Sequence, residues 1–218
     1  MCLKSQARQA FDYNCLDIDR LMYFHQLEGG VDRGRRSENL EVLNKSAIVL
    51  ICAVWEAYCE DIVSEAIRKI VEEASSSDRL GTNIKKIIAI EIKKNPNELQ
   101  VWKLADHGWR NFLIDRYERL EEERNRKLNT PKSNFINQLF DKNLGISNIT
   151  SEWYWQNMTC EQAQQKLDEY VTLRGDIAHR ARNAQTLRKT DVNAFLNHVK
   201  KIVEKTDIYV LQNLRTMN

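Results

Sequence analysis

Glycine and proline are scarce in this sequence. Its 218 residues include only 7 glycines and 2 prolines, whereas leucine, isoleucine, alanine, glutamate, lysine and arginine are frequent. Because sheets and barrels need turn-forming residues more often than this, the composition argues against a strand-rich protein. It predicts an all-α chain, and this length is enough for one domain with a sizeable buried core.

The cysteines of this sequence are not spaced as zinc ligands or as the cysteines of a disulfide framework are. The five cysteines are odd in number and scattered, with no C-x-x-C pair and no histidine at zinc-finger spacing. We therefore expect no structural metal and no disulfide. The five are Cys2, Cys15, Cys52, Cys59 and Cys160.

Long apolar runs and an excess of one charge are missing as well. No run approaches the about 20 residues needed to cross a bilayer, and the first residues lack the apolar core of a signal peptide. Lysine and arginine number 33 and aspartate and glutamate 31, so the net charge of +2 gives no general attraction to nucleic acid or membrane. We expect a soluble, cytoplasmic protein with no membrane partner, in which any binding of nucleic acid depends on a local patch.

Apolar residues recur at helical spacing along most of the chain. Gly29-Gly30, the serines from Ser75 to Ser77, and Asn95-Pro96 provide stops between the periodic segments. A short polar link joins the last two helices, which predicts that they are antiparallel neighbours in a helical bundle. The predicted helices cover about residues 3–28, 38–74, 78–95, 97–128, a short segment after residue 131, 159–182 and 190–215.

The aromatic cluster Trp153-Tyr154-Trp155 lies in an irregular part of the sequence and has two interpretations. Exposed aromatic rings can stack on nucleic-acid bases. Alternatively, the rings pack a loop onto the core, and this is the interpretation we favour.

Four histidines supply all the side chains that titrate near neutral pH. His107 lies in an expected turn and His198 on the last predicted helix, and neither has a motif around it, so we interpret both as structural or solvated. His25 follows Arg20 by five residues, but the residues between them are bulky and apolar with no polar partner. These observations leave His179 as the candidate for chemistry.

The segment Arg174-Gly-Asp-Ile-Ala-His179 combines a fixed cation, a carboxylate and a titratable imidazole. An arginine can hold two phosphate oxygens, and an imidazole can transfer a proton at neutral pH. On a helix, Asp176 and His179 share one face, so the carboxylate can orient the ring. Arg174 lies about 140° round the helix from His179. The two converge on one phosphate only if Arg174 reaches around the helix or if a second subunit supplies the other half.

The Arg-x4-His spacing of Arg174 and His179, followed by a final amphipathic helix, resembles the signature of the HEPN superfamily, and of its RiboL-PSP-HEPN group in particular. The stretch Val54-Trp-Glu-Ala-Tyr58 is similar to that group's long early helix. The likeness covers both core helix pairs and leaves out residues 78–155. We therefore expect one HEPN-like domain over residues 1–218, a bundle of long antiparallel helices with a helical insertion at about 78–155.

This resemblance implies a homodimer whose two Arg-x4-His segments meet in a cleft and cut single-stranded RNA without a metal or other cofactor. His179 would activate the ribose 2′-hydroxyl or protonate the leaving oxygen, Arg174 would stabilise the charged transition state, and Asp176 would be a supporting polar group. Members of the superfamily often act as toxins or in defence against phage. An antitoxin or another regulatory protein is therefore an expected class of partner.

Gly175 departs from the family pattern, in which a polar residue often follows the arginine directly; Asp176 would compensate. Glycine inside a helix costs about 1 kcal/mol relative to alanine. Its presence therefore suggests the close approach of another backbone or of a ligand.

Several alternatives stay open. Arg174, Asp176 and His179 could form only a surface salt-bridge network, and the chain could be a non-catalytic HEPN-like module that binds a protein or nucleotide partner. A DNA-binding regulator is disfavoured, because the sequence has no helix-turn-helix pattern and no strongly basic helix. Glu56 and Glu60 either bring a carboxylate near the cleft or face solvent.

The basic residues that follow the motif also have two interpretations. They could guide a phosphate backbone toward it, or only solvate the connection between the last two helices. They are Arg180, Arg182, Arg188 and Lys189.

Overall fold

The computed structural model of the chain describes residues 4–29, 38–123, 130–180 and 186–216. In these ranges the backbone is helical without a strand, and only an isolated bridge joins Trp155 and Met158. The expected all-α fold is therefore confirmed. The α-helices are α1 (Gln6–Gly29), α2 (Glu38–Glu73), α3 (Thr82–Lys93), α4 (Gly108–Glu123), α5 (Ser133–Leu144), α6 (Cys160–Arg180) and α7 (Lys189–Thr216), and the 3-10 helices are η1 (Ser77–Arg79), η2 (Glu98–Leu104) and η3 (Ile149–Glu152).

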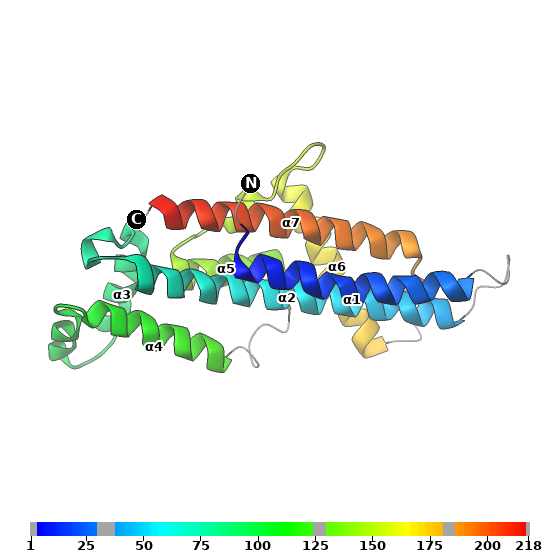
Figure 1. The fold of residues 1–218 in the computed structure, drawn as a ribbon. Coiled ribbons are helices and arrows are strands. Elements are labelled where there is room, and N and C mark those ends of the chain that lie inside the picture. The colour runs from blue at the N-terminus through cyan, green and yellow to red at the C-terminus, as the bar shows by residue number, and fades with distance from the viewer. Residues whose placement is uncertain (1–3, 30–37, 124–129, 181–185, 217–218) are drawn as a thin grey trace.

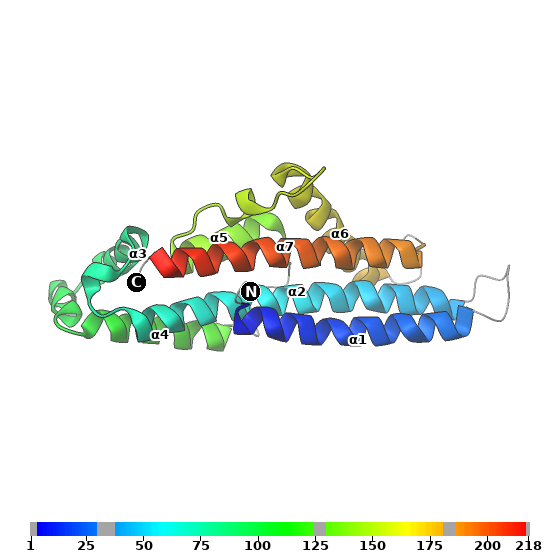
Figure 2. The same cartoon turned by 45° about the horizontal axis from the view of Figure 1, so that its top comes forward.

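Helix α2 is the centre of the molecule. Figure 1 shows α1 running antiparallel beside it and α7 parallel to it, while α4 lies along the half of α2 that ends at Glu73. The turned view in Figure 2 separates α7 from the layer of α1 and α2, with α5 and α6 behind. None of the helices in the described ranges is long and apolar enough to cross a membrane.

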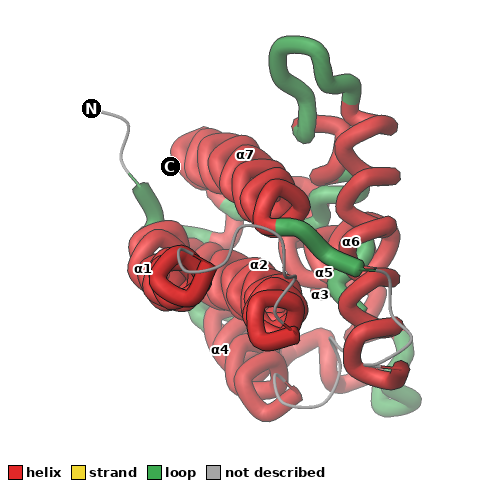
Figure 3. Tube along the Cα trace, turned by 90° about the vertical axis from the view of Figure 1, so that its right-hand side faces the viewer, coloured by secondary structure: helices red, strands yellow, loops and turns green. Residues whose placement is uncertain are grey.

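Helices α6 and α7 are neighbours, as their short link predicts, but they are not aligned. Seen along the axes of α1, α2 and α7, helix α6 is viewed from the side and crosses the bundle steeply (Figure 3). A short link brings only the joined ends of two helices together and leaves their crossing angle to side-chain packing. The antiparallel arrangement expected for this pair is therefore corrected to a crossing.

Two predicted helices differ from the observed ones in detail. The expected helix over residues 97–128 is divided into η2 and α4, because Asp106 has a left-handed φ of 54° and interrupts the helix; residues 124–128 of that prediction lie outside the described residues. Gly108 is required just after this turn, since a Cβ there would collide with the backbone carbonyl of Lys103. The expected helix over residues 78–95 is shortened to α3, preceded by η1.

Arg110 links the start of α4 to the end of α2 by hydrogen bonds. Its guanidinium donates hydrogen bonds to the backbone carbonyls of Val71, at 3.4 Å, and of Ala74, and it lies 4.4 Å from the ring centroid of Trp109. The last carbonyls of a helix have no partner within the helix, so a cation placed there satisfies them and favours the helix dipole. The segment from α3 to α4 is thereby held at one end of the molecule.

The centre of the core is aromatic. Trp55 of α2 is fully buried and donates a hydrogen bond from Nε1 to the carbonyl of Pro131 at 3.1 Å. Trp153 meets it edge to face at 5.8 Å and donates from its own Nε1 to Thr206 Oγ1 of α7 at 2.9 Å. Trp153 is thus a core residue, which supports the packing interpretation of the aromatic cluster; Tyr154 remains 55% exposed. The insertion expected over residues 78–155 stays a prediction.

The adjacent residues Trp153 and Tyr154 provide a matched test of this core. Trp153→Ala leaves a cavity and an unpaired Thr206 hydroxyl, so we expect the free energy of unfolding to fall by about 3–5 kcal/mol. Tyr154→Ala removes only an exposed ring over Lys205 and should cost less than about 1 kcal/mol. Urea denaturation of both variants measures the difference, and equal losses would contradict the described packing.

Candidate functional site

Helix α6 carries the Arg174–His179 segment near its end. The helix begins with the expected capping box, because Thr159 N donates to Gln162 Oε1 at 3.0 Å and Gln162 N donates to Thr159 Oγ1 at 3.3 Å. One stripe of the helix is buried against α2 and α7, and this packing fixes which side of α6 faces the core. The stripe consists of Ala163, Leu167, Val171 and Ile177.

Arg174 lies on this buried stripe, three residues after Val171 and three before Ile177, and its side chain is half-buried. It lies close to Cys52 and Glu56, which are one turn apart on α2. Burial raises the pKa of the Cys52 thiol to about 12 and also raises the pKa of Glu56, and the nearby Arg174 charge acts against both increases. An arginine therefore occupies an apolar position of α6 and has a carboxylate of α2 beside it.

Of the two glutamates Glu56 and Glu60, the structure places Glu56 near Arg174. Glu56 is half-buried, and the neighbouring Trp55 and Tyr58 of the same sequence stretch face the core. Glu60 lies one turn further along α2. Because a buried charge without a partner is strongly disfavoured, the nearby Arg174 stabilises the charged form of Glu56.

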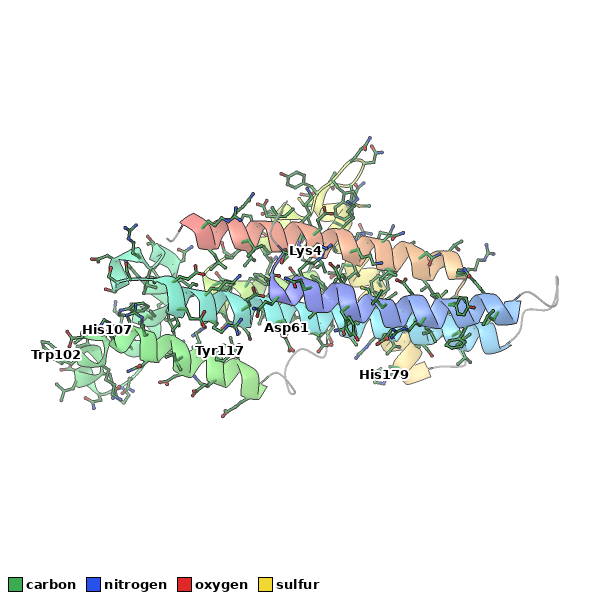
Figure 4. The ribbon with its side chains drawn as sticks, viewed as in Figure 1. Lys4, Asp61, Trp102, His107, Tyr117 and His179 are labelled. Atoms are coloured by element: carbon green, nitrogen blue, oxygen red, sulfur yellow. The ribbon has the colours of Figure 1, made fainter. Side chains whose placement is uncertain are left out.

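Asp176 and His179 lie on a different side of α6, and both are exposed. Figure 4 shows the labelled His179 near the end of the helix, projecting away from the bundle. Among the described residues, neither side chain has a hydrogen bond or an ion pair. The salt-bridge network of Arg174, Asp176 and His179 considered above is therefore not formed by this part of the chain, and Arg174 and His179 point in different directions.

Gly175 lies between these two sides of the helix. A Cβ at this position would meet nothing within 4 Å. The close approach suggested by this glycine is therefore not made by the described part of this chain, and open space remains beside Arg174 and Asp176.

The other histidines have different surroundings. His198 is buried and donates from Nε2 to the carbonyl of Ala163 at 3.0 Å, and burial lowers its pKa, which favours the neutral ring of a structural histidine. His107 is exposed, with Nδ1 2.8 Å from Arg110 Nη1. Arg20 pairs with Asp17 at 2.7 Å, and the side chain of His25 lies outside the described residues.

The basic residues after the motif are only partly described. Arg188 is exposed and Lys189 half-buried at the start of α7, whereas Arg182 and the side chain of Arg180 lie outside the described residues. Within those residues no group of three or more histidine, cysteine, aspartate or glutamate side chains is arranged to hold a metal ion.

The pairing of Arg174 with Glu56 can be tested by titration. We expect the pKa of Glu56 to lie above its ordinary value, and Arg174→Gln should raise it further because the opposing positive charge is lost. Arg174→Lys keeps a charge and should cause a smaller change. NMR detection of the glutamate carboxyl carbons measures these values, and an unchanged pKa in Arg174→Gln would contradict the proximity.

A comparison with protein families agrees with the motif and the fold. Residues 16–212 match the family model described as RiboL-PSP-HEPN, a span that includes the Arg174–His179 segment, Glu56 and the whole of α2 to α6. Searches of curated proteins and of solved structures find no match. Since the matched span is most of the chain, this protein belongs to the RiboL-PSP-HEPN family of the HEPN superfamily.

Proposed function

We propose that the protein is a metal-independent endoribonuclease that cleaves single-stranded RNA, with Arg174 and His179 as catalytic residues and Asp176 in support. Membership of the HEPN superfamily indicates an RNase-like or nucleotide-related function. The proposal of RNA cleavage rests on the Arg174–His179 segment. On this helix the exposed imidazole of His179 shares a face with the carboxylate of Asp176, and the guanidinium of Arg174 is half-buried.

The proposed reaction needs only these side chains, the RNA and water. The ribose 2′-oxygen attacks the adjacent phosphorus, and the bond from phosphorus to the 5′-oxygen breaks. His179 either accepts the 2′-hydroxyl proton, in which case water protonates the leaving 5′-oxygen, or donates a proton to the leaving 5′-oxygen, in which case water takes up the 2′-hydroxyl proton. Arg174 stabilises the negative charge on the phosphate oxygens. The products are a 2′,3′-cyclic phosphate and a 5′-hydroxyl, with no metal or external nucleophile required.

The proposed active unit is a homodimer, because one chain presents the two catalytic residues in different directions. Arg174 is held on the side of α6 that faces α2, whereas His179 is exposed about 140° away. In a twofold symmetric dimer each copy offers the same surface, so Arg174 of one copy can meet the phosphate bound by His179 of the other. Two equivalent sites would result.

Glu56 has a positioning role in this proposal. Its carboxylate lies near Arg174 and limits the orientations of a long, flexible side chain. An arginine that is already oriented loses less conformational freedom when it binds a phosphate. Glu56 does not touch RNA in this scheme.

The alternative function is a non-catalytic HEPN-like module for dimerisation or partner binding. It is favoured by the proximity of Arg174 to Glu56, since an arginine beside a half-buried carboxylate can contribute to stability alone. A toxin or phage-defence role, with an antitoxin or another regulatory protein as partner, extends the ribonuclease proposal and is supported by the family resemblance.

The first test compares the parent protein with His179→Ala on end-labelled single-stranded RNA in EDTA. We expect the parent to produce cyclic-phosphate ends and the variant to be about 100- to 10,000-fold slower, because a general acid–base group is lost. His107→Ala removes an exposed histidine elsewhere and is the matched control. A folded parent that cleaves none of several RNA sequences would support the binding module instead.

A second test asks whether the site is shared between two copies. Arg174→Ala and His179→Ala are each expected to be inactive alone. When they are unfolded together and refolded, mixed dimers contain one intact site, and about a quarter of the parent activity should return. No recovery, with mixed dimers shown to form, would place both catalytic residues in one chain.

A further inference from the structure

An exposed apolar and basic surface lies at the end of the molecule away from His179. Trp102 is 73% exposed, and Leu99 and Val101 of the same 3-10 helix are 69% and 54% exposed. Figure 4 shows the labelled Trp102 at one end of the molecule, well separated from His179. We refer to the α3–η2 surface, which consists of Lys93, Lys94, Leu99, Val101, Trp102 and Lys103.

Positive charge is concentrated in this part of the chain. Residues 77–110 contain seven lysines and arginines and four aspartates and glutamates, a local net charge of +3, whereas the whole chain has only +2. Within that segment Glu91 is already paired with Arg116 at 2.8 Å and Arg119 at 2.7 Å, both from α4.

The lysines of the α3–η2 surface, in contrast to the arginines that pair with Glu91, are available to bind a ligand. Lys93, Lys94 and Lys103 are exposed and have no ion pair among the described residues. Glu98 and Asp106 are the acidic residues beside them in the chain. With these two acids the surface has a net charge of +1, and its three lysines are the part of the positive segment that lies beside Trp102.

We propose that the α3–η2 surface binds single-stranded RNA at a distance from the cleavage site. Trp102 offers a flat ring on which one base can stack, and Lys93, Lys94 and Lys103 contact the phosphates on either side of that base. This inference rests on the proposed ribonuclease function and adds a substrate-binding region to it. Leu99 and Val101 support the ring and the sugar next to it.

RNA fits this surface better than a lipid membrane does. Three exposed apolar side chains offer little surface for insertion, and even a whole fatty-acyl chain by itself gives only marginal membrane binding. Stacking on one exposed aromatic ring combined with several lysines is, in contrast, a common way to bind single strands without strong sequence preference.

The distance between the two regions predicts a dependence on RNA length. Arg174 lies near Glu56, and α2 continues for 17 residues from there to Glu73, or about 25 Å, before the chain reaches α3. Only a long RNA can contact both His179 and Trp102. A short RNA bound at the cleavage site should be indifferent to Trp102.

The test is a fluorescence-anisotropy titration of labelled single-stranded RNA with the full chain carrying His179→Ala, so that the RNA stays intact. For an RNA of about 30 nucleotides, adding Trp102→Ala should weaken binding about tenfold, whereas an RNA of about 5 nucleotides can bind at the cleavage site without Trp102 and should lose less affinity. Tyr13→Ala, which removes a 69% exposed ring on α1, is the matched control and should change neither affinity.

The lysines are tested by the salt dependence of the same binding. Removing one lysine that binds a phosphate should reduce the slope of log affinity against log salt concentration by about 0.7. Lys103→Gln should show this reduction, and Lys201→Gln, at an exposed position of α7 where the lysine pairs with Glu204 at 3.0 Å, should not. Circular dichroism confirms that the variants remain folded.

The possible outcomes separate this inference from the proposed catalysis. Long RNA that binds through Trp102 without being cleaved by the parent would overturn the ribonuclease and leave the surface assignment intact. Cleavage by the parent, with Trp102→Ala binding as tightly as Tyr13→Ala, would overturn the surface assignment alone. Trp102-dependent binding to anionic phospholipid vesicles but not to RNA would also overturn it, in favour of a membrane contact.

Discussion

Burial of α2 on nearly all sides is the constraint on which the rest of the structure depends. Its apolar residues occupy several faces of the helix, so neighbours must surround it, and α1, α4, α5, α6 and α7 all pack against it. Trp55 and Tyr58 satisfy their polar atoms through Pro131 and through the carbonyl of Val203, at 3.3 Å. Burial of Trp55 and Tyr58 with their polar groups paired makes the middle of this helix a rigid reference for the site.

The same constraint explains the position of Arg174. Helix α6 must place its apolar stripe on α2, and Arg174 belongs to that stripe, so its guanidinium is drawn toward Cys52 and Glu56. Asp176 and His179 lie off the stripe and stay exposed. Packing therefore separates the cation from the imidazole within one chain, and this separation is the physical reason for proposing a site that two copies complete.

Much of the fold, and part of the site, could be predicted from the sequence because helical periodicity is local. The bounds of α2 and α7, and the shared face of Asp176 and His179, follow from spacing alone. The turn at Asp106 and the steep crossing of α6 depend on a left-handed φ and on packing between distant segments. The same holds for the proximity of Arg174 and Glu56, which periodicity cannot specify.

The central claim is that one RNA phosphate binds between Arg174 of one copy and His179 of another. The most direct measurement is a crystal structure of the protein with a single-stranded RNA whose scissile nucleotide lacks the 2′-hydroxyl, so that no cleavage occurs. We predict a twofold dimer with that phosphate held by Arg174 of one protomer and His179 of the partner subunit. A phosphate bound elsewhere, or touched by neither residue, would contradict the account.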